Sequence, residues 1–156
     1  MNTRTFVPLP SSPTRLWSVA LLAGLLLSAC DGGAAGPTGW QASAPGSWSS
    51  AKHPGERLSA TQRPFQGAPS DLATQILESV VLAPGGGKML RTNAIRECPG
   101  AAGEMEFVRR SPPRRIVVFF SIRNNVSYEI RWSGTTNDAF PPEVLAFAES
   151  RLCRVI

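Results

Sequence analysis

Near the start of the chain lies an apolar stretch, residues 16–27, that contains no charged side chain. As a helix it would extend roughly 18 Å at about 1.5 Å per residue, whereas a bilayer core is about 30 Å thick. It is therefore too short to span a membrane. The basic residues Arg4 and Arg15 precede it, as in export signals. We interpret residues 1–29 as a signal peptide that is removed, which leaves one modest domain.

The residues that end this segment, Leu27-Ser28-Ala29-Cys30, resemble the lipobox of bacterial lipoprotein precursors. The resemblance covers the export region only. It implies cleavage before Cys30, a diacylglyceryl group on the Cys30 sulfur, and an acyl chain, typically palmitate, on the new amine. Two or three acyl chains hold a protein stably on a bilayer. The alternative is an ordinary secretory signal, which would leave Cys30 an unmodified thiol.

Asp31 directly follows the predicted lipidation site. In enterobacterial lipoproteins an Asp at this place is associated with retention in the inner membrane, and sorting rules differ between bacterial groups. The resemblance therefore implies a lipid-anchored protein on the periplasmic face of a cell membrane, with the inner membrane slightly favoured over the outer.

Residues 30–69 are rich in Gly, Pro, Ser and Ala and show no helix or strand periodicity. So few large apolar side chains cannot offset the entropy lost when a backbone is ordered. We therefore expect a disordered, lipidated tether. His53 has no other metal-ligating or catalytic residue near it in the sequence, so we assign it no role. Four sparse apolar residues are exceptions and also suit short binding elements or interfacial anchors: Trp40, Trp48, Leu58 and Phe65.

Residues 70–156 carry regular patterns that predict a small domain. Apolar residues recur at helical spacing from Leu72 to Val80 and again from Val144 to Val155. The expected fold class is α+β: a small four-stranded antiparallel sheet with an N-terminal and a C-terminal helix packed on one face. The predicted strands are residues 88–97, 104–110, 115–123 and 126–133.

The pair Asn124-Asn125 separates the last two predicted strands and indicates a hairpin, because Asn tolerates positive φ. A two-residue loop would place four large apolar side chains beside Ser, Glu and Arg. A three-residue loop would leave only Val117 and Phe119 on the second face of the sheet. We favour the three-residue loop, so Val117 and Phe119 become candidate contacts for a partner.

Apart from Cys30, the chain has two cysteines, Cys98 and Cys153. An even number of cysteines in an oxidising compartment predicts a disulfide, here between the exit of the first predicted strand and the last helix. The functional alternatives are a redox pair or a metal site. A redox pair normally has close spacing, and a metal needs more ligands than these two residues supply.

The chain has 16 Lys and Arg against 11 Asp and Glu, a formal net charge of +5. The excess is modest and no aromatic-basic repeat accompanies it, so nucleic acid is not an expected partner. Four arginines crowd a predicted hairpin tip, and they suit anionic lipid headgroups or an acidic envelope protein. The simpler interpretation, which we favour, is a solvated turn that limits aggregation. The four are Arg109, Arg110, Arg114 and Arg115.

No catalytic constellation is recognisable in the predicted domain. It contains no His, which excludes a Ser-His-Asp triad. Glu104 and Glu106 occupy alternating strand positions, whereas glycosidase carboxylates flank a cleft. Residues 85–88 lack the spacing of a phosphate loop. We therefore expect no enzyme activity, cofactor or metal, and interpret the protein as a lipid-anchored periplasmic accessory or binding lipoprotein. The alternative is a cell-wall hydrolase or an inhibitor of one.

Overall fold

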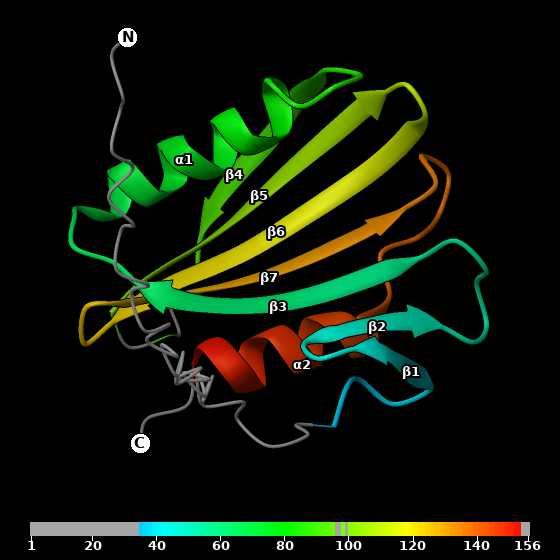
Figure 1. The fold of residues 1–156 in the computed structure, drawn as a ribbon, viewed down its shortest axis with the longest axis horizontal. Coiled ribbons are helices and arrows are strands. Elements are labelled where there is room, and N and C mark those ends of the chain that lie inside the picture. The colour runs from blue at the N-terminus through cyan, green and yellow to red at the C-terminus, as the bar shows by residue number, and fades with distance from the viewer. Residues whose placement is uncertain (1–34, 96–97, 99, 154–156) are drawn as a thin grey trace, which may run out of the picture.

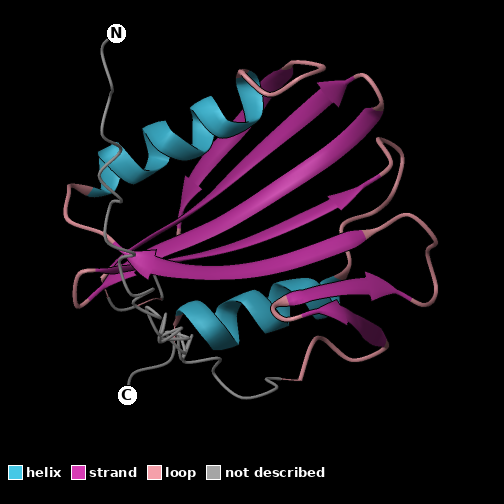
Figure 2. Ribbon diagram, in the orientation of Figure 1, coloured by secondary structure: helices cyan, strands magenta, loops and turns pink. Residues whose placement is uncertain are grey.

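The computed structural model describes residues 35–95, 98 and 100–153. Within them one antiparallel sheet has the strand order β1-β2-β3-β7-β6-β5-β4 (Figure 1). Helix α1 connects β3 to β4, and helix α2 follows β7 (Figure 2). The elements are β1 Trp40–Ala44, β2 Ser47–Ser50, β3 Arg57–Pro64, α1 Pro69–Val81, β4 Gly87–Ala94, β5 Ala101–Arg110, β6 Pro113–Arg123, β7 Val126–Gly134 and α2 Pro142–Leu152.

The predicted sheet was wrong in size and in how its faces are covered. It has seven strands within the described residues, not four. The two helices cover opposite faces rather than one, because their buried residues belong to two separate clusters. The helices and strands expected from residue 70 onward are nevertheless present. The prediction lacked β1 and β2, whose residues Trp40 and Trp48 pack with α2 over the second face of the sheet.

The prediction of a disordered tether over residues 30–69 is wrong for residues 40–64, which contain β1, β2 and β3. β3 pairs with β7 along its whole length, so it extends the predicted sheet directly. The ordering has a plain physical reason, since the four sparse apolar residues of this segment are all buried. These residues are Trp40, Trp48, Leu58 and Phe65.

Helix α1 packs on the first face of the sheet. Its buried residues Leu72, Ile76 and Val80 recur at helical spacing and meet apolar side chains of β5 and β6. Pro69 begins the helix, and the Asp71 carboxylate accepts a 2.8 Å hydrogen bond from the backbone N–H of Ala68. The sheet contributes Met105, Phe107, Ile116, Val118 and Phe120 to this cluster.

Helix α2 packs on the second face, together with the β1-β2 hairpin. Its buried residues are Val144, Phe147, Ala148 and Leu152. The ring of Phe147 meets Trp48 of β2 edge-on, with 5.3 Å between the ring centroids. The sheet residues beneath include Val117, Phe119, Ile130 and Trp132.

The β6-β7 hairpin has a two-residue loop, so the predicted three-residue register is wrong. Arg123 pairs with Val126, and both Asn124 and Asn125 have positive φ, as a type I′ turn requires. This register is favourable because both faces of the sheet are covered, so apolar side chains on either face are buried. The four large apolar side chains that a two-residue loop places beside Ser, Glu and Arg lie on the α1 side of the sheet. Val117 and Phe119 lie under α2 and are about 1% exposed, so they are not the exposed second-face residues that the predicted register implied.

Candidate functional site

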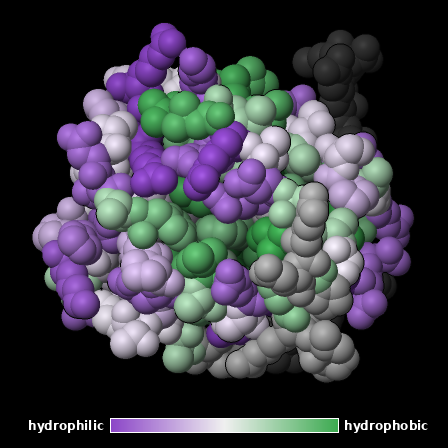
Figure 3. All heavy atoms as spheres, turned by 180° about the vertical axis from the view of Figure 1, so that it is seen from behind, coloured by the Kyte–Doolittle hydropathy of each residue, from purple (hydrophilic) through white to green (hydrophobic). Residues whose placement is uncertain are grey.

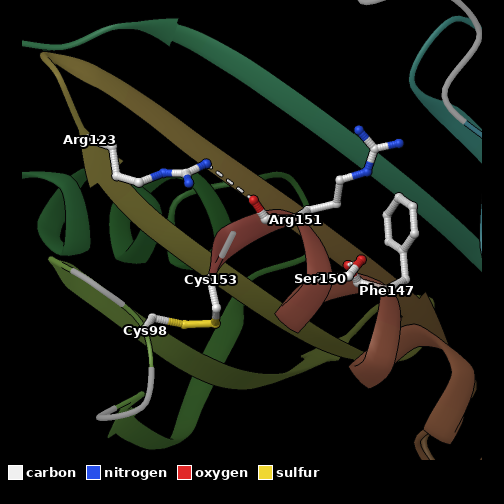
Figure 4. The surroundings of a disulfide bond; sticks show 6 residues. All are labelled: Cys98, Arg123, Phe147, Ser150, Arg151 and Cys153. Carbon is white, nitrogen blue, oxygen red and sulfur yellow. Dashed lines mark hydrogen bonds between the residues drawn. A yellow bond between two sulfur atoms is a disulfide. The ribbon is translucent and has the colours of Figure 1, made fainter. Parts of the chain in front are cut away.

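The disulfide between Cys98 and Cys153 is confirmed. It joins the segment after β4 to the residue that caps α2, and Figure 4 shows it beside the end of that helix. A second contact holds the same end, because the Arg123 guanidinium donates a 3.2 Å hydrogen bond to the Arg151 carbonyl (Figure 4). The last turn of α2 is thus fixed both to the end of β6 and to the segment beyond β4.

A shallow hollow of about 300 Å³ lies between α2 and the β4-β5 edge of the sheet. Residues 93–95 form one wall, Leu145 and Glu149 of α2 form the other, and Phe119 and Glu104 complete the lining. The surface of the molecule seen from behind has hydrophobic residues near its middle, between hydrophilic ones (Figure 3). The hollow has the volume of a small ligand site or of one inserted side chain.

A row of ion pairs crosses β4, β5 and β6 beside the hollow. Cross-strand partners lie on the same face of a sheet. Glu104 pairs with Phe119, and Glu106 pairs with Val117. Both glutamates therefore lie on the α2 side of the sheet. Arg91 donates to Glu106 at 2.5 Å and to Glu104 at 3.1 Å, and Arg115 donates to Glu106 at 2.7 Å. Both glutamates are therefore structural partners of arginine, and the structure does not place them as a pair flanking a cleft.

Glu106 is buried, and burial by itself would raise the pKa of its carboxyl. The hydrogen bonds and positive charges of Arg115 and Arg91 outweigh burial, so the pKa lies below its ordinary value. Glu106 is consequently held as a carboxylate at neutral pH.

The four arginines of the predicted tip are mostly engaged in contacts between segments. Arg114 donates a 2.7 Å hydrogen bond to the Gly55 carbonyl in the β2-β3 connection. Arg109 donates to the Pro84 carbonyl after α1, and Arg115 reaches the Asp138 carbonyl at 3.1 Å as well as Glu106. Arg110 is exposed. The tip is thus more than a solvated turn, because three of its arginines donate hydrogen bonds to backbone carbonyls of neighbouring connections.

A buried carboxyl group that the sequence reasoning missed lies near the same end of the sheet. Glu56 precedes β3 and is 2% exposed, and its Oε2 has no hydrogen-bond partner among the described residues. Burial raises the pKa of Glu56, with further raising by the charges of Asp138 and Glu143 and a partial lowering by His53. The indole N–H of Trp132 also lies close enough to lower this pKa, but it forms no hydrogen bond of normal geometry.

In the sequence, Glu56 lies between Gly55 and Arg57 in a segment expected to be disordered. No pattern at that place predicts a buried carboxyl group. In the part of the chain that the structure describes, no group of three or more His, Cys, Asp or Glu side chains is arranged to hold a metal ion. No helix of the described residues is long and apolar enough to cross a membrane. Cys30 and Asp31 lie outside the described residues.

Comparison with known proteins identifies a fold but no family. No protein-family model matches the chain, and no curated protein matches it. Among solved structures, the chain is similar to PA94, a protein of unknown function from Pseudomonas aeruginosa. The TM-score is 0.52 at 16% identity, over 65% of this chain and 72% of that one. The solution structure of cyanobacterial PsbP (CyanoP) from Synechocystis sp. PCC 6803 gives a TM-score of 0.48 at 13% identity, with the same two coverages. The likeness to PA94 concerns the fold alone.

Proposed function

We propose that the protein is a lipoprotein anchored through Cys30 on the periplasmic face of a cell membrane, where its domain binds another component of the envelope. The proposal rests on the lipobox and on which two of the three cysteines form the disulfide. Cys98 and Cys153 are joined to each other, which leaves Cys30 as the cysteine outside the bond. A disulfide is characteristic of oxidising compartments such as the periplasm, and the lipobox supplies the route there.

The hollow beside α2 is the proposed binding site, and it is the observation that carries the binding role. Its lining is mixed, since Phe119 and Leu145 contribute apolar groups and Glu104 and Glu149 contribute carboxylates. The Cys98–Cys153 bond ties the end of α2 to the segment that follows β4, so the position of one wall is fixed relative to the other. Such a hollow suits an apolar side chain that carries a positive charge at its end, as a lysine or arginine of a partner protein does.

Mass spectrometry of the mature protein from membranes tests the anchor. We expect the mature chain to begin at Cys30 with a diacylglyceryl group on sulfur and an acyl chain on the amine. Cys30→Ala should remove the modification and release the protein from the membrane fraction. An unmodified Cys30 in the wild-type protein would contradict the proposal.

Site-specific photo-crosslinking tests the binding site. A photoreactive amino acid at Leu145, which is 38% exposed at the hollow, should give one dominant adduct in intact cells. The same amino acid at Thr74, exposed on α1 over the opposite face, is the matched control and should not give that adduct. Glu149→Arg should weaken the Leu145 adduct if the partner presents a positive charge. Equal adducts from Leu145 and Thr74 would exclude the hollow as the site.

A further inference from the structure

Apolar and cationic side chains gather where β4 begins, and we call this group the tip patch. Among the described residues, Leu82 is the most exposed of the large apolar residues, at 77%, while Leu90 is 52% and Met89 37% exposed. Lys88 and Arg110 are exposed beside them, and Arg109 is half-buried. The tip patch consists of Leu82, Lys88, Met89, Leu90, Arg109 and Arg110.

These residues meet at one end of the sheet although they come from three segments. Gly87 pairs with Arg109 at the start of β4, and the Arg109 side chain donates to the Pro84 carbonyl in the α1-β4 connection. Gly85 has a φ of +94°, and its Cα lies so near the Ser111 carbonyl that a Cβ would clash with it. The α1-β4 connection is therefore held against the β5-β6 turn, and Leu82 stays close to the cations.

The sign of charge on this surface is positive. Three of the six residues of the tip patch are basic, Lys88, Arg109 and Arg110, and none of the six is acidic. Exposed Leu and Met beside Lys and Arg is the combination found where a protein contacts an anionic bilayer, because the apolar groups enter the interface and the cations meet the headgroups.

The chain enters the sheet at the same end as the tip patch. Trp40 begins β1, and Lys88 and Met89 lie near the start of β4. The residue pairs of the hydrogen-bonded ladder connect these positions across the sheet. In order they are Trp40 with Ser50, Ser49 with Arg57, Arg57 with Ser133, Ser133 with Ile116, Ile116 with Phe107, and Phe107 with Met89.

This placement fits an anchor at Cys30. Cys30 precedes Trp40 by ten residues, which span at most about 35 Å when fully extended. Seven strands at about 4.8 Å spacing separate β1 from β4 by roughly 30 Å. A lipid anchor at Cys30 can thus insert into a membrane whose surface contacts this end of the sheet.

We propose that the tip patch docks on the anionic lipid surface that holds the protein, so that this end of the sheet faces the bilayer. The proposal rests on the proposed anchor for its orientation but not for the lipid contact itself. Docking by the tip patch leaves the hollow beside α2 on a different part of the molecule, available to a partner.

Sedimentation with vesicles tests the docking without the lipid anchor. The mature chain from residue 30, with Cys30→Ser, is mixed with vesicles of phosphatidylcholine alone or with added phosphatidylglycerol. We expect binding only to the phosphatidylglycerol vesicles, and weaker binding at high salt. The double variant Leu82→Ser/Arg110→Glu should lower the partition coefficient by about 10-fold or more.

The matched control is Val126→Ser/Arg63→Glu, which likewise replaces an apolar residue by Ser and reverses one arginine charge, away from both the tip patch and the hollow. Val126 is half-buried at the start of β7, and Arg63 is exposed near the end of β3, so both lie at the opposite end of the sheet. The control should bind as the wild-type chain does, and circular dichroism with urea unfolding shows whether each variant is folded. Equal losses in the two double variants, equal binding to both kinds of vesicle, or no binding of the wild-type chain would each overturn the docking surface. Failure of the anchor is a separate result, since it appears as an unmodified Cys30 in the mass spectrum of the native protein.

Discussion

At the scale of single residues, two buried glutamates have opposite electrostatic surroundings. Glu56 is 2% exposed with an oxygen that has no hydrogen-bond partner among the described residues, and burial raises its pKa. Glu106 is also buried, but its arginine partners lower its pKa despite the burial. Neutralising the two carboxyl groups should therefore change stability in opposite directions at neutral pH.

Glu56→Gln should stabilise the fold at neutral pH. A raised pKa in the folded state means that Glu56 favours folding at acidic pH and that this contribution is lost as the pH rises through the folded-state pKa. Gln carries no charge at any pH, so it removes the loss, by about 1 kcal/mol for one buried unpaired group. Urea unfolding at about pH 7.5 and about pH 4 measures the difference, which should shrink at the lower pH. The exposed Glu149, changed to Gln, is the control and should show little effect.

Glu106→Gln should destabilise the fold at neutral pH by about 2 kcal/mol, because it replaces two charge-assisted contacts with neutral ones. A lowered pKa in the folded state contributes stability above the unfolded-state pKa, and that contribution is lost as the pH falls through the folded-state value. Unfolding of the wild-type and variant proteins should therefore converge in acid. A loss that is the same at every pH would show that packing, not charge, determines the effect.

At the scale of elements, the β6-β7 turn offers a direct test of the register. Asn125 has a φ of 59°, which glycine adopts without cost and β-branched residues avoid. We expect Asn125→Gly to preserve or slightly increase the free energy of unfolding, and Asn125→Val to lower it by about 1–2 kcal/mol. Urea unfolding of both variants checks this, and equal stabilities would argue for a longer loop.

The sequence made the elements from α1 to α2 predictable, because all of them except β4 carry several apolar residues in a recognisable pattern. β7 alternates cleanly, and β6 contains an apolar run too long for one face. The strands β1 to β3 were missed because β1 and β2 each contain only one large apolar residue, Trp40 and Trp48, and β3 only Leu58. No period can be recognised from one such residue, and their burial depends on α2, which lies about 100 residues later.

The candidate site was predictable only where residue counts alone indicate the chemistry. The disulfide could be predicted because two cysteines remain apart from Cys30 and the lipobox predicts an oxidising compartment. The hollow and the buried Glu56 arise from segments distant in sequence, since Glu56 approaches Trp132 only once β3 pairs with β7. Val117 and Phe119 were misplaced because the burial of the second face depends on where α2 packs.

At the scale of the whole molecule, the disulfide should contribute much of the stability of a small two-faced sheet. It spans a sequence separation of 55 residues, for which the loop-closure relation gives about 4 kcal/mol. Cys98→Ser/Cys153→Ser should lower the free energy of unfolding by up to that amount, measured by urea unfolding and compared with wild-type protein before and after reduction. A reduced wild-type protein as stable as the oxidised one would contradict this prediction.

The same bond makes proteolysis unequal along the chain. A cut between Cys98 and Cys153 leaves both fragments covalently joined. A cut in the exposed connection of residues 51–54 separates the N-terminal piece, including Cys30, from everything after it. Among the described residues, the pairing of β2 with β3, the hydrogen bond from the Ala60 N–H to the Gly46 carbonyl and the packing of Trp40 and Trp48 would then hold the two pieces together. If Cys30 anchors the protein as proposed, one nick at that place would release the rest of the domain from the membrane.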